Sequence, residues 1–194
     1  MVFSEEICDK LTDDEVVRKS IGDLNYFTCL YLRYETKLLN YIRRIAFLSD
    51  EEAEDILQDS FIKAWRNLRG YDQGLKFSSW LYRIAHNETI SFWRSKKSHG
   101  KDNRVDFDDH VFNSLSFETS FDMDVPQHDK IIREVLEQMP VKYRDVLVLK
   151  YFESMSYEDI SDILKIPEGT VATRINRAKK SFATLARTKN ISFE

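Results

Sequence analysis

The stretch from Ser156 to Lys180 reads SYEDISDILKIPEGTVATRINRAKK and predicts two short helices separated by a tight turn. Ser156 with an acidic residue three positions later, Asp159, is the pattern of a capping box, in which both side chains satisfy backbone N–H groups at a helix start. Pro167 disfavours helical conformation at the residue before it, so the first helix ends near Lys165. A second helix then begins near Glu168, and the pattern indicates a helix-turn-helix.

The second of these helices has two chemically different sides. At 100° per residue its apolar residues fall on one side, and polar residues fall on the other. Arg and Asn can form bidentate contacts with guanine and adenine edges, whereas Lys and Thr bind phosphates. This pattern favours a helix that enters the DNA major groove, although a hairpin of two helices with a solvated face is the alternative. The outward residues are Thr173, Asn176, Arg177 and Lys180.

The rest of the chain also shows helical periodicity. Apolar residues recur at spacings of three and four, and no alternating strand pattern of useful length is present. We therefore expect an all-α protein. The expected helices cover residues 12–21, 24–47, 50–68, 77–97, 127–138, 141–153, 156–164 and 168–187.

An acidic stretch interrupts the helical pattern between residues 98 and 126. It carries seven Asp or Glu residues against Lys101 and Arg104, and its aromatic residues follow no period. This composition predicts a flexible acidic linker between two small helical domains. The expected domains are residues 1–97 and 127–194, with the helix-turn-helix in the second.

Basic residues are concentrated in two places although the chain as a whole is acidic. The net charge is −4, with 32% charged and 42% hydrophobic residues. Residues 76–101 hold six Lys or Arg and one acid, and residues 170–189 hold six Lys or Arg and none. Two basic segments of this kind predict contact with phosphate at two places.

The first basic segment forms an amphipathic helix from Phe77 to Arg94. One stripe of this helix carries Trp80, Asn87, Ser91 and Arg94. An indole, an amide, a hydroxyl and a guanidinium together suit single-stranded DNA, because they offer stacking, base-edge contacts and phosphate binding. The alternative is that Trp80 belongs to the hydrophobic core.

The helix near residues 53–59 is acidic on one side. Asp55, Gln58 and Asp59 share this side because they are spaced by three and four. Acidic pairs of this kind are also found in metal-dependent nucleases, but no His or further acid completes such a site. We expect a protein-docking face, no catalytic residues, no metal and no cofactor.

Cys8 and Cys29 form no CxxC pair and have no His at ligand spacing. The expected state is two reduced thiols in a cytoplasmic protein. No apolar run approaches the roughly 18–20 residues that span a bilayer, so no membrane insertion is expected. The N-terminal residues also lack a signal-peptide pattern, which leaves the cytoplasm as the expected location.

These segments together resemble the extracytoplasmic-function group of bacterial sigma factors. The resemblance covers about residues 12–97 and 127–187. It rests on four strings in this order: AEDILQDSFIKAW at 53–65, FSSWLYRIAHN at 77–87, MPVKYRDVLVL at 139–149, and SYEDI at 156–160 followed by GTV at 169–171.

The resemblance implies the partners and the role of each face. It implies binding to the RNA polymerase core, recognition of promoter DNA as duplex at the −35 element and as melted strand at the −10 element, and control by an anti-sigma factor. A flipped −10 base would lie against the loop at about residues 69–76. The implied core-binding residues are Asp55, Gln58, Asp59 and Ile62, the −10 residues are Trp80, Arg83, Asn87, Ser91 and Arg94, and the −35 residues are Thr170, Thr173, Arg174, Asn176, Arg177 and Lys180.

Two departures leave the promoter sequence open. Ala172 and Asn176 stand where many relatives have larger or basic residues, and Ser91 occupies the second −10 position. A stand-alone helix-turn-helix regulator is the main competing function. It would show no binding to polymerase core in the absence of DNA.

Overall fold

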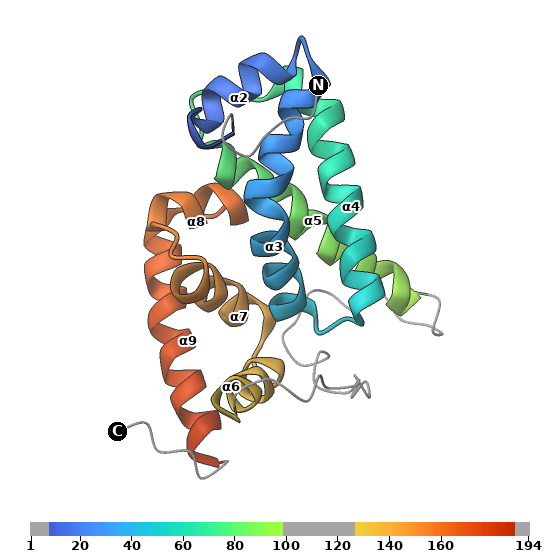
Figure 1. Ribbon diagram of the computed structural model, residues 1–194. Coiled ribbons are helices and arrows are strands. Elements are labelled where there is room, and N and C mark those ends of the chain that lie inside the picture. Colours follow the sequence, from blue (N-terminus) through green and yellow to red (C-terminus); the bar gives the residue numbers. More distant parts are fainter. Residues whose placement is uncertain (1–7, 99–126, 189–194) are drawn as a thin grey trace.

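The structure, a computed structural model, describes residues 8–98 and 127–188. In these two ranges every regular element is a helix, which confirms the expected all-α class (Figure 1). The predicted linker at 98–126 lies outside the described residues except for Ser98, the last residue of a helix. The N-terminal elements are α2 (Asp13–Ser20), η1 (Leu24–Tyr26), α3 (Phe27–Ala46), α4 (Asp50–Asn67), η2 (Leu68–Gly70) and α5 (Phe77–Ser98). The C-terminal elements are α6 (Gln127–Glu137), α7 (Val141–Leu147), the π-helical turn η4 (Val148–Phe152), α8 (Tyr157–Leu164) and α9 (Glu168–Thr188).

Capping boxes fix the starts of three helices. Thr12, Ser49 and Ser156 each accept a hydrogen bond from the backbone N–H three residues on, and an acidic side chain there bonds back to the cap. Each box satisfies two N–H groups that the helix itself leaves unpaired. The predicted box at Ser156 and Asp159 is confirmed.

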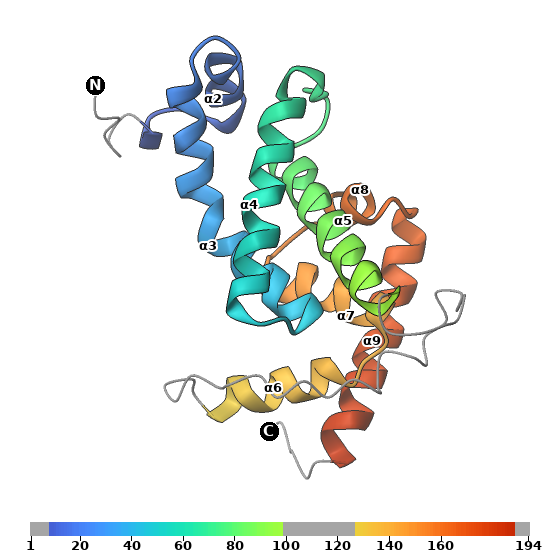
Figure 2. The ribbon, with the colours of Figure 1, turned by 90° about the vertical axis from the view of Figure 1, so that its right-hand side faces the viewer.

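The core of the N-terminal half is built around α3. Leu30, Leu38, Tyr41 and Ile42 of this helix are 0% exposed. The helix packs against both α4 and α5, which lie side by side (Figure 2). Burial of a Leu or Ile side chain stabilises a fold by about 1.5–3 kcal/mol. The part of α3 that these two helices enclose therefore contributes most to the stability of the N-terminal half.

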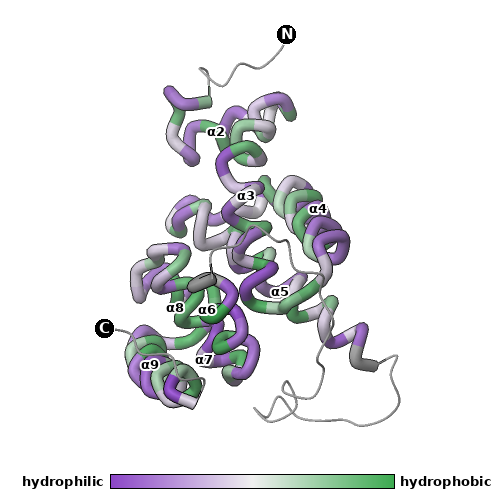
Figure 3. The backbone as a smooth tube through the Cα atoms, turned by 60° about the horizontal axis from the view of Figure 1, so that its bottom comes forward, coloured by the Kyte–Doolittle hydropathy of each residue, from purple (hydrophilic) through white to green (hydrophobic). Residues whose placement is uncertain are grey.

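The C-terminal half packs directly on α3 and α5 rather than standing apart. Helix α8 lies along α5, and the two halves share one continuous cluster of buried side chains. Val146 and Leu147 of α7 and Ile160 and Ile163 of α8 are buried, and Figure 3 shows both hydrophobic and hydrophilic segments along α9 at the edge of the molecule. The relative placement of the halves could not be predicted from sequence, because it depends on contacts between residues about 70–110 positions apart, such as Tyr82 with Glu153 and Arg44 with Glu153.

The two cysteines form a disulfide, so the expectation of reduced thiols is wrong for this structure. Cys8 and Cys29 are bonded with their Cα atoms 5.2 Å apart, and both are buried. Arg33 on α3 holds the same segment through the carbonyl oxygens of Cys8 and Leu11 and an ion pair with Asp13 at 2.6 Å. Sequence spacing gave no signal, because the fold brings together two cysteines that are 21 positions apart.

Reducing this disulfide should lower the stability of the chain. A crosslink that closes a loop of this length is expected to contribute about 3 kcal/mol, mainly by restricting the unfolded chain. Urea unfolding of the oxidised protein with and without a thiol reductant measures the difference. The double variant Cys8→Ser/Cys29→Ser is the control and should show no dependence on reductant. Equal midpoints for oxidised and reduced parent protein would contradict the prediction.

Candidate nucleic-acid interface

The helix-turn-helix is formed by α8, a turn and α9. Lys165 ends α8 in the left-handed conformation (φ 54°), and its N–H bonds to the carbonyl of Ser161. The apolar side of α9, at Val171, Ile175 and Ala178, is at most 1% exposed. The opposite side is therefore turned to solvent, as the periodicity predicts.

The predicted −35 residues lie on this solvent-facing side of α9. Thr173, Asn176, Arg177 and Lys180 are exposed, and Thr170 and Arg174 are half-buried. The six residues thus form one continuous face along nearly three turns of the helix. The amide and guanidinium groups on it are free to approach a groove edge without rearrangement of the core.

A hollow of about 330 Å³ adjoins this face between the start of α7 and α9. Two residues that line it, Lys142 and Tyr143, were not predicted as site residues. The Lys142 ammonium lies 5.4 Å from the centre of the Tyr143 ring. The sequence does not indicate that Lys142 and Tyr143 lie near α9, because only the packing of α7 on α9 brings them together. The other lining residues are Gly169, Thr170, Thr173, Arg174 and Arg177.

The second predicted DNA face lies on α5. Asn87, Ser91 and Arg94 are exposed, and Arg83 is half-buried. Their spacings of four, four and three put them on one side of the helix. The structure therefore brings four of the five predicted −10 residues together.

Trp80, the fifth, belongs to the core. Its side chain is only 8% exposed and packs on the rings of Tyr71 at 5.2 Å and Phe77 at 5.7 Å. A buried indole cannot offer a stacking surface to a base in this conformation. The alternative that the sequence left open, a core tryptophan, describes its position in the structure.

The loop before α5 is held by its own hydrogen bonds and by this aromatic cluster. The Tyr71 hydroxyl donates to the carbonyl of Leu75, and the Asp72 carboxylate accepts from the N–H of Gly74 at 2.9 Å. Burial, followed by the nearby carboxylates of Asp14, Asp13 and Asp72, raises the pKa of Tyr71 to about 12. The hydroxyl therefore stays protonated well above neutral pH, so it remains a donor to the carbonyl of Leu75.

A third face lies on α4. The predicted docking residues Asp55, Gln58, Asp59 and Ile62 are all exposed, and Ile62 is 44% accessible. Trp65, one turn further on, is 45% exposed and was not predicted. An exposed Trp beside an exposed Ile adds an apolar centre to an acidic rim, a combination that is common in protein–protein interfaces.

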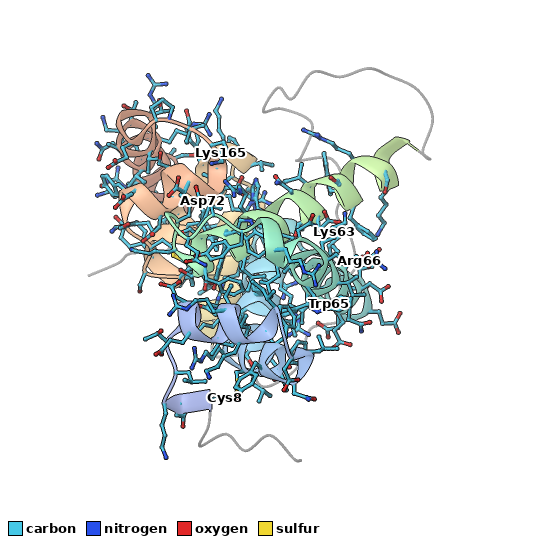
Figure 4. All side chains as sticks on the ribbon, turned by 90° about the horizontal axis from the view of Figure 1, so that it is seen from above. Cys8, Lys63, Trp65, Arg66, Asp72 and Lys165 are labelled. Atoms are coloured by element: carbon cyan, nitrogen blue, oxygen red, sulfur yellow. A yellow bond between two sulfur atoms is a disulfide. The ribbon has the colours of Figure 1, made fainter. Side chains whose placement is uncertain are left out.

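The three faces lie on three different helices. Figure 4 shows Trp65 and Arg66 of α4 on one side of the molecule and Lys165, in the turn between α8 and α9, on another. Ion pairs of Lys63 with Glu88 and of Lys96 with Glu52 fasten α4 to α5. These ion pairs hold the α4 face in a fixed position relative to α5.

The described ranges contain neither a metal-binding cluster nor a membrane-spanning helix. No group of three or more His, Cys, Asp or Glu residues there could hold a metal ion, so the α4 carboxylates have no partners for a nuclease-like centre. Within residues 8–98 and 127–188 no helix is long and apolar enough to cross a membrane.

Comparison with known proteins identifies both halves. Residues 30–99 match the family Sigma-70 region 2, and residues 129–182 match Sigma-70, region 4. The RNA polymerase sigma-H factor of Pseudomonas aeruginosa is 35% identical over 174 residues, which cover 86% of this chain and 89% of that protein. The ECF RNA polymerase sigma factor SigW of Bacillus subtilis is 36% identical over 169 residues, or 82% and 88% of the two chains.

Solved structures show the same fold. CnrH in complex with the cytosolic domain of CnrY superposes with a TM-score of 0.67 at 20% identity, covering 89% of this chain and 95% of that one. The sigma factor RpoE of Bartonella quintana, in complex with the anti-sigma factor NepR, gives a TM-score of 0.66 at 22% identity, covering 83% and 96%. With both regions matched in order, and with curated relatives above 30% identity along most of its length, the chain belongs to the extracytoplasmic-function sigma factors of RNA polymerase.

Proposed function

We propose that this alternative sigma factor divides its task among three faces: α4 binds the polymerase core, α5 reads the melted −10 strand and α9 reads the −35 duplex. The observation that supports this division is that the three faces are exposed at the same time and lie on different helices. We assign residues 1–97 to the first domain, 98–126 to the linker and 127–194 to the second domain.

In the −35 contact we assign base reading to Asn176 and Arg177. Both are exposed and stand on adjacent positions of the α9 face. Lys180 and Thr173 flank them and are suited to phosphates. Lys142 and Tyr143 extend this contact at the edge of the hollow, where a phosphate can meet the ammonium and the phenol together.

Changing Arg177 should alter sequence preference rather than general DNA affinity. Arg177→Ala is expected to cost about 1–3 kcal/mol at one base position if the guanidinium bonds a guanine edge. Binding of holoenzyme to promoter fragments with each −35 base varied in turn measures this. Arg187→Ala, on the same helix but beyond the proposed face, is the control and should leave the preference unchanged. A uniform loss over all fragments would identify Arg177 as a phosphate contact instead.

In the contact with the polymerase core, we assign Ile62 and Trp65 to the centre of the interface. We assign its rim to Asp55, Gln58 and Asp59. The apolar pair supplies buried area, and the carboxylates set orientation and association rate. Control by an anti-sigma factor, as in the solved complex of RpoE with NepR named above, is part of the proposal. We place the protein in the cytoplasm, where polymerase and chromosome are found, and assign it no catalytic activity.

Removing a carboxylate from the α4 face should weaken binding to the polymerase core. Asp55→Ala is expected to raise the dissociation constant by about fivefold or more, since charged groups at an interface rim act mainly through association rate. Surface-immobilised core polymerase measures both rates. Asp162→Ala, on α8 in the other domain, is the control. Core affinity equal to that of the parent would count against the assigned face.

Transcription from reconstituted holoenzyme tests the assignment of the three faces to the polymerase core, the −10 strand and the −35 duplex. Core polymerase with this factor should produce start sites that core polymerase alone does not, and their upstream sequences define both promoter elements. A factor that binds DNA but produces no new start sites, or that fails to bind core in the absence of DNA, would instead behave as the stand-alone regulator.

A further inference from the structure

The disulfide of Cys8 with Cys29 belongs to a protein that we place in the cytoplasm. Cytoplasmic thiols are normally kept reduced, and the disulfides that do form there are usually transient ones with a catalytic or redox-sensing role. A bond that forms and breaks with the redox state of the cell therefore fits this location better than a permanent crosslink.

The disulfide joins a short turn to α3. Cys29 lies inside α3 and is 0% exposed, whereas Cys8 precedes α2 and is 5% exposed. Asp9 and Lys10, the two residues after Cys8, are exposed. Local opening of such a turn needs far less free energy than global unfolding. A small thiol or disulfide can thus reach Cys8 while α3 stays folded.

Arg33 connects this turn to the start of α2. One turn along α3 from the disulfide, Arg33 donates to the carbonyls of Cys8 and Leu11. Its guanidinium also pairs with Asp13 at 2.6 Å. The Asp13 carboxylate in turn accepts from the hydroxyl of Tyr34. The same groups therefore hold the disulfide turn, the first residue of α2 and the ring of Tyr34.

Tyr34 continues the series of contacts to the loop before α5. Its ring centre lies 5.9 Å from that of Phe77, and the ring of Phe77 lies 5.7 Å from that of Tyr71. The Tyr71 hydroxyl holds the loop at residues 69–76 by donating to the carbonyl of Leu75. Figures 1 and 2 show α2 and this loop at the same end of the molecule. Packed contacts now lead without a break from the disulfide to the loop.

Breaking the bond requires the turn at Cys8 to move. Two separate thiol groups take more space than a bonded pair of sulfurs, because non-bonded atoms stay at van der Waals distance. A close-packed interior has no room to spare, so the turn shifts instead. The shift displaces the carbonyl groups that Arg33 binds and weakens the hold of Asp13 on Tyr34.

We propose that Cys8 and Cys29 are a redox-modification site for low-molecular-weight disulfides of the glutathione type, and that the bond orders the loop at 69–76, where we place the flipped −10 base. The oxidised factor then binds the melted −10 strand more tightly than the reduced factor does. The proposal deepens the function proposed above and rests on its assignment of α5 to the −10 element.

The bond forms by thiol–disulfide exchange in two steps. The Cys8 thiolate attacks one sulfur of the small disulfide R–S–S–R, which gives a mixed disulfide and releases one RS⁻. The Cys29 thiolate attacks the Cys8 sulfur of that mixed disulfide, which forms the protein bond and releases the second RS⁻. Two protein thiols are oxidised, one small disulfide is reduced, and the two protons of the protein thiols end on two RSH. An excess of RSH reverses both steps.

The modification is measured on the full chain in mixtures of glutathione and glutathione disulfide. Free thiols are alkylated at each ratio and counted by mass spectrometry. We expect one transition from the dithiol to the disulfide as the share of glutathione disulfide rises. Cys29→Ser should accumulate a mixed disulfide at Cys8, because no second thiol displaces the glutathione. A parent chain that keeps one state at every ratio would overturn the proposal.

Amide hydrogen exchange measures whether the bond orders the loop. The N–H groups of Tyr71, Gly74 and Leu75 are hydrogen-bonded, so their exchange reports opening of the loop. We expect these three amides to exchange about fivefold or more faster in the reduced parent than in the oxidised parent. Exchange in α9 should be the same in both forms, and circular dichroism shows that the reduced chain is folded.

Binding by reconstituted holoenzyme measures the effect on the −10 strand. The factor is oxidised or reduced before it is assembled with core polymerase. The probes are a single-stranded −10 oligonucleotide and a −35 duplex, both taken from the promoter that holoenzyme selects. Reduction should weaken binding of the −10 strand about fivefold or more and leave the −35 duplex unchanged. The double variant Cys8→Ser/Cys29→Ser should respond to neither treatment.

Tyr34→Phe tests the connection between the bond and the loop. It removes the hydroxyl that binds Asp13 and keeps a ring against Phe77, so the difference between oxidised and reduced forms should fall to about twofold or less. Tyr31→Phe is the matched control. It removes another hydroxyl from α3, but its ring packs on Phe61 of α4 at 4.8 Å, and it should keep the full difference.

Equal exchange of the three loop amides in the two redox forms would overturn the proposal. Equal losses on the −10 and −35 probes would also overturn it, since they would report a general loss of stability. If neither redox form of the holoenzyme binds the −10 strand, the proposed function fails instead. Hydrogen exchange then still decides whether the bond orders the loop.

Discussion

Replacing Arg144 with methionine should destabilise the protein by about 3–5 kcal/mol, because it leaves several buried carbonyl groups without donors. The guanidinium is 0% exposed and donates to the carbonyls of Leu136, Glu137 and Met139 at 2.8–3.0 Å, at the end of α6. It also reaches the carbonyl of Ile45 on α3 at 2.7 Å. Burial lowers the pKa of Arg144 to about 10, so the side chain remains charged at neutral pH.

Urea unfolding followed by circular dichroism measures this loss. Arg187→Met, an exposed arginine near the end of α9, is the control and should change stability by no more than about 0.5 kcal/mol. Methionine fills a similar volume, so a large effect reports lost hydrogen bonds rather than a cavity. A loss below about 1 kcal/mol for Arg144→Met would mean that water replaces the guanidinium at these carbonyls.

Replacing Asn87 with alanine should impair promoter opening about 10- to 100-fold while leaving binding to closed duplex nearly unchanged. The amide is exposed on α5 between Arg83 and Ser91, where an extruded base can reach it. A specific base contact contributes about 1–3 kcal/mol, and about 1.4 kcal/mol corresponds to a factor of ten. The proposed contact would form only after the base has left the stack, so the expected loss falls on opening.

Permanganate reactivity of unpaired thymines measures opening, and filter binding at low temperature measures closed-complex affinity. Asn67→Ala is the control, because this amide is also exposed but lies at the end of α4 and bonds the carbonyl of Lys63 at 2.8 Å. Equal losses in opening and in duplex binding would show that Asn87 contacts the intact duplex instead.

Local sequence was sufficient for the helices and for the outward faces. A capping box needs only residues three positions apart, and a helix face follows from the spacing of polar and apolar residues, so Ser156 with Asp159 and the face from Thr173 to Lys180 could be predicted. The same reasoning placed Asp55, Gln58 and Asp59 on one exposed side of α4. In each case the deciding interactions lie within a few turns of one helix.

The burial of Trp80 could not be predicted from helical spacing. Helical spacing put it in a stripe with Asn87 and Ser91, but the side chain turns into the cluster with Tyr71 and Phe77. A large indole gains more from burial than from exposure, and whether a neighbouring loop covers it is decided outside the helix. Trp65, predicted for no site, remains exposed for the converse reason: in the described ranges no element packs over that side of α4.

The sequence by itself determined an all-helical chain with a helix-turn-helix, two basic helix faces and an acidic face on a third helix, because each depends on spacing along a single helix. Only the tertiary structure decided the disulfide of Cys8 with Cys29, the joining of Lys142 and Tyr143 to the α9 face, and the hydrogen bond of Ser79 with Asp159 between the two halves. These depend on pairs of residues about 20 to 80 positions apart. Their contacts are fixed by how buried surfaces fit together, which no local pattern records.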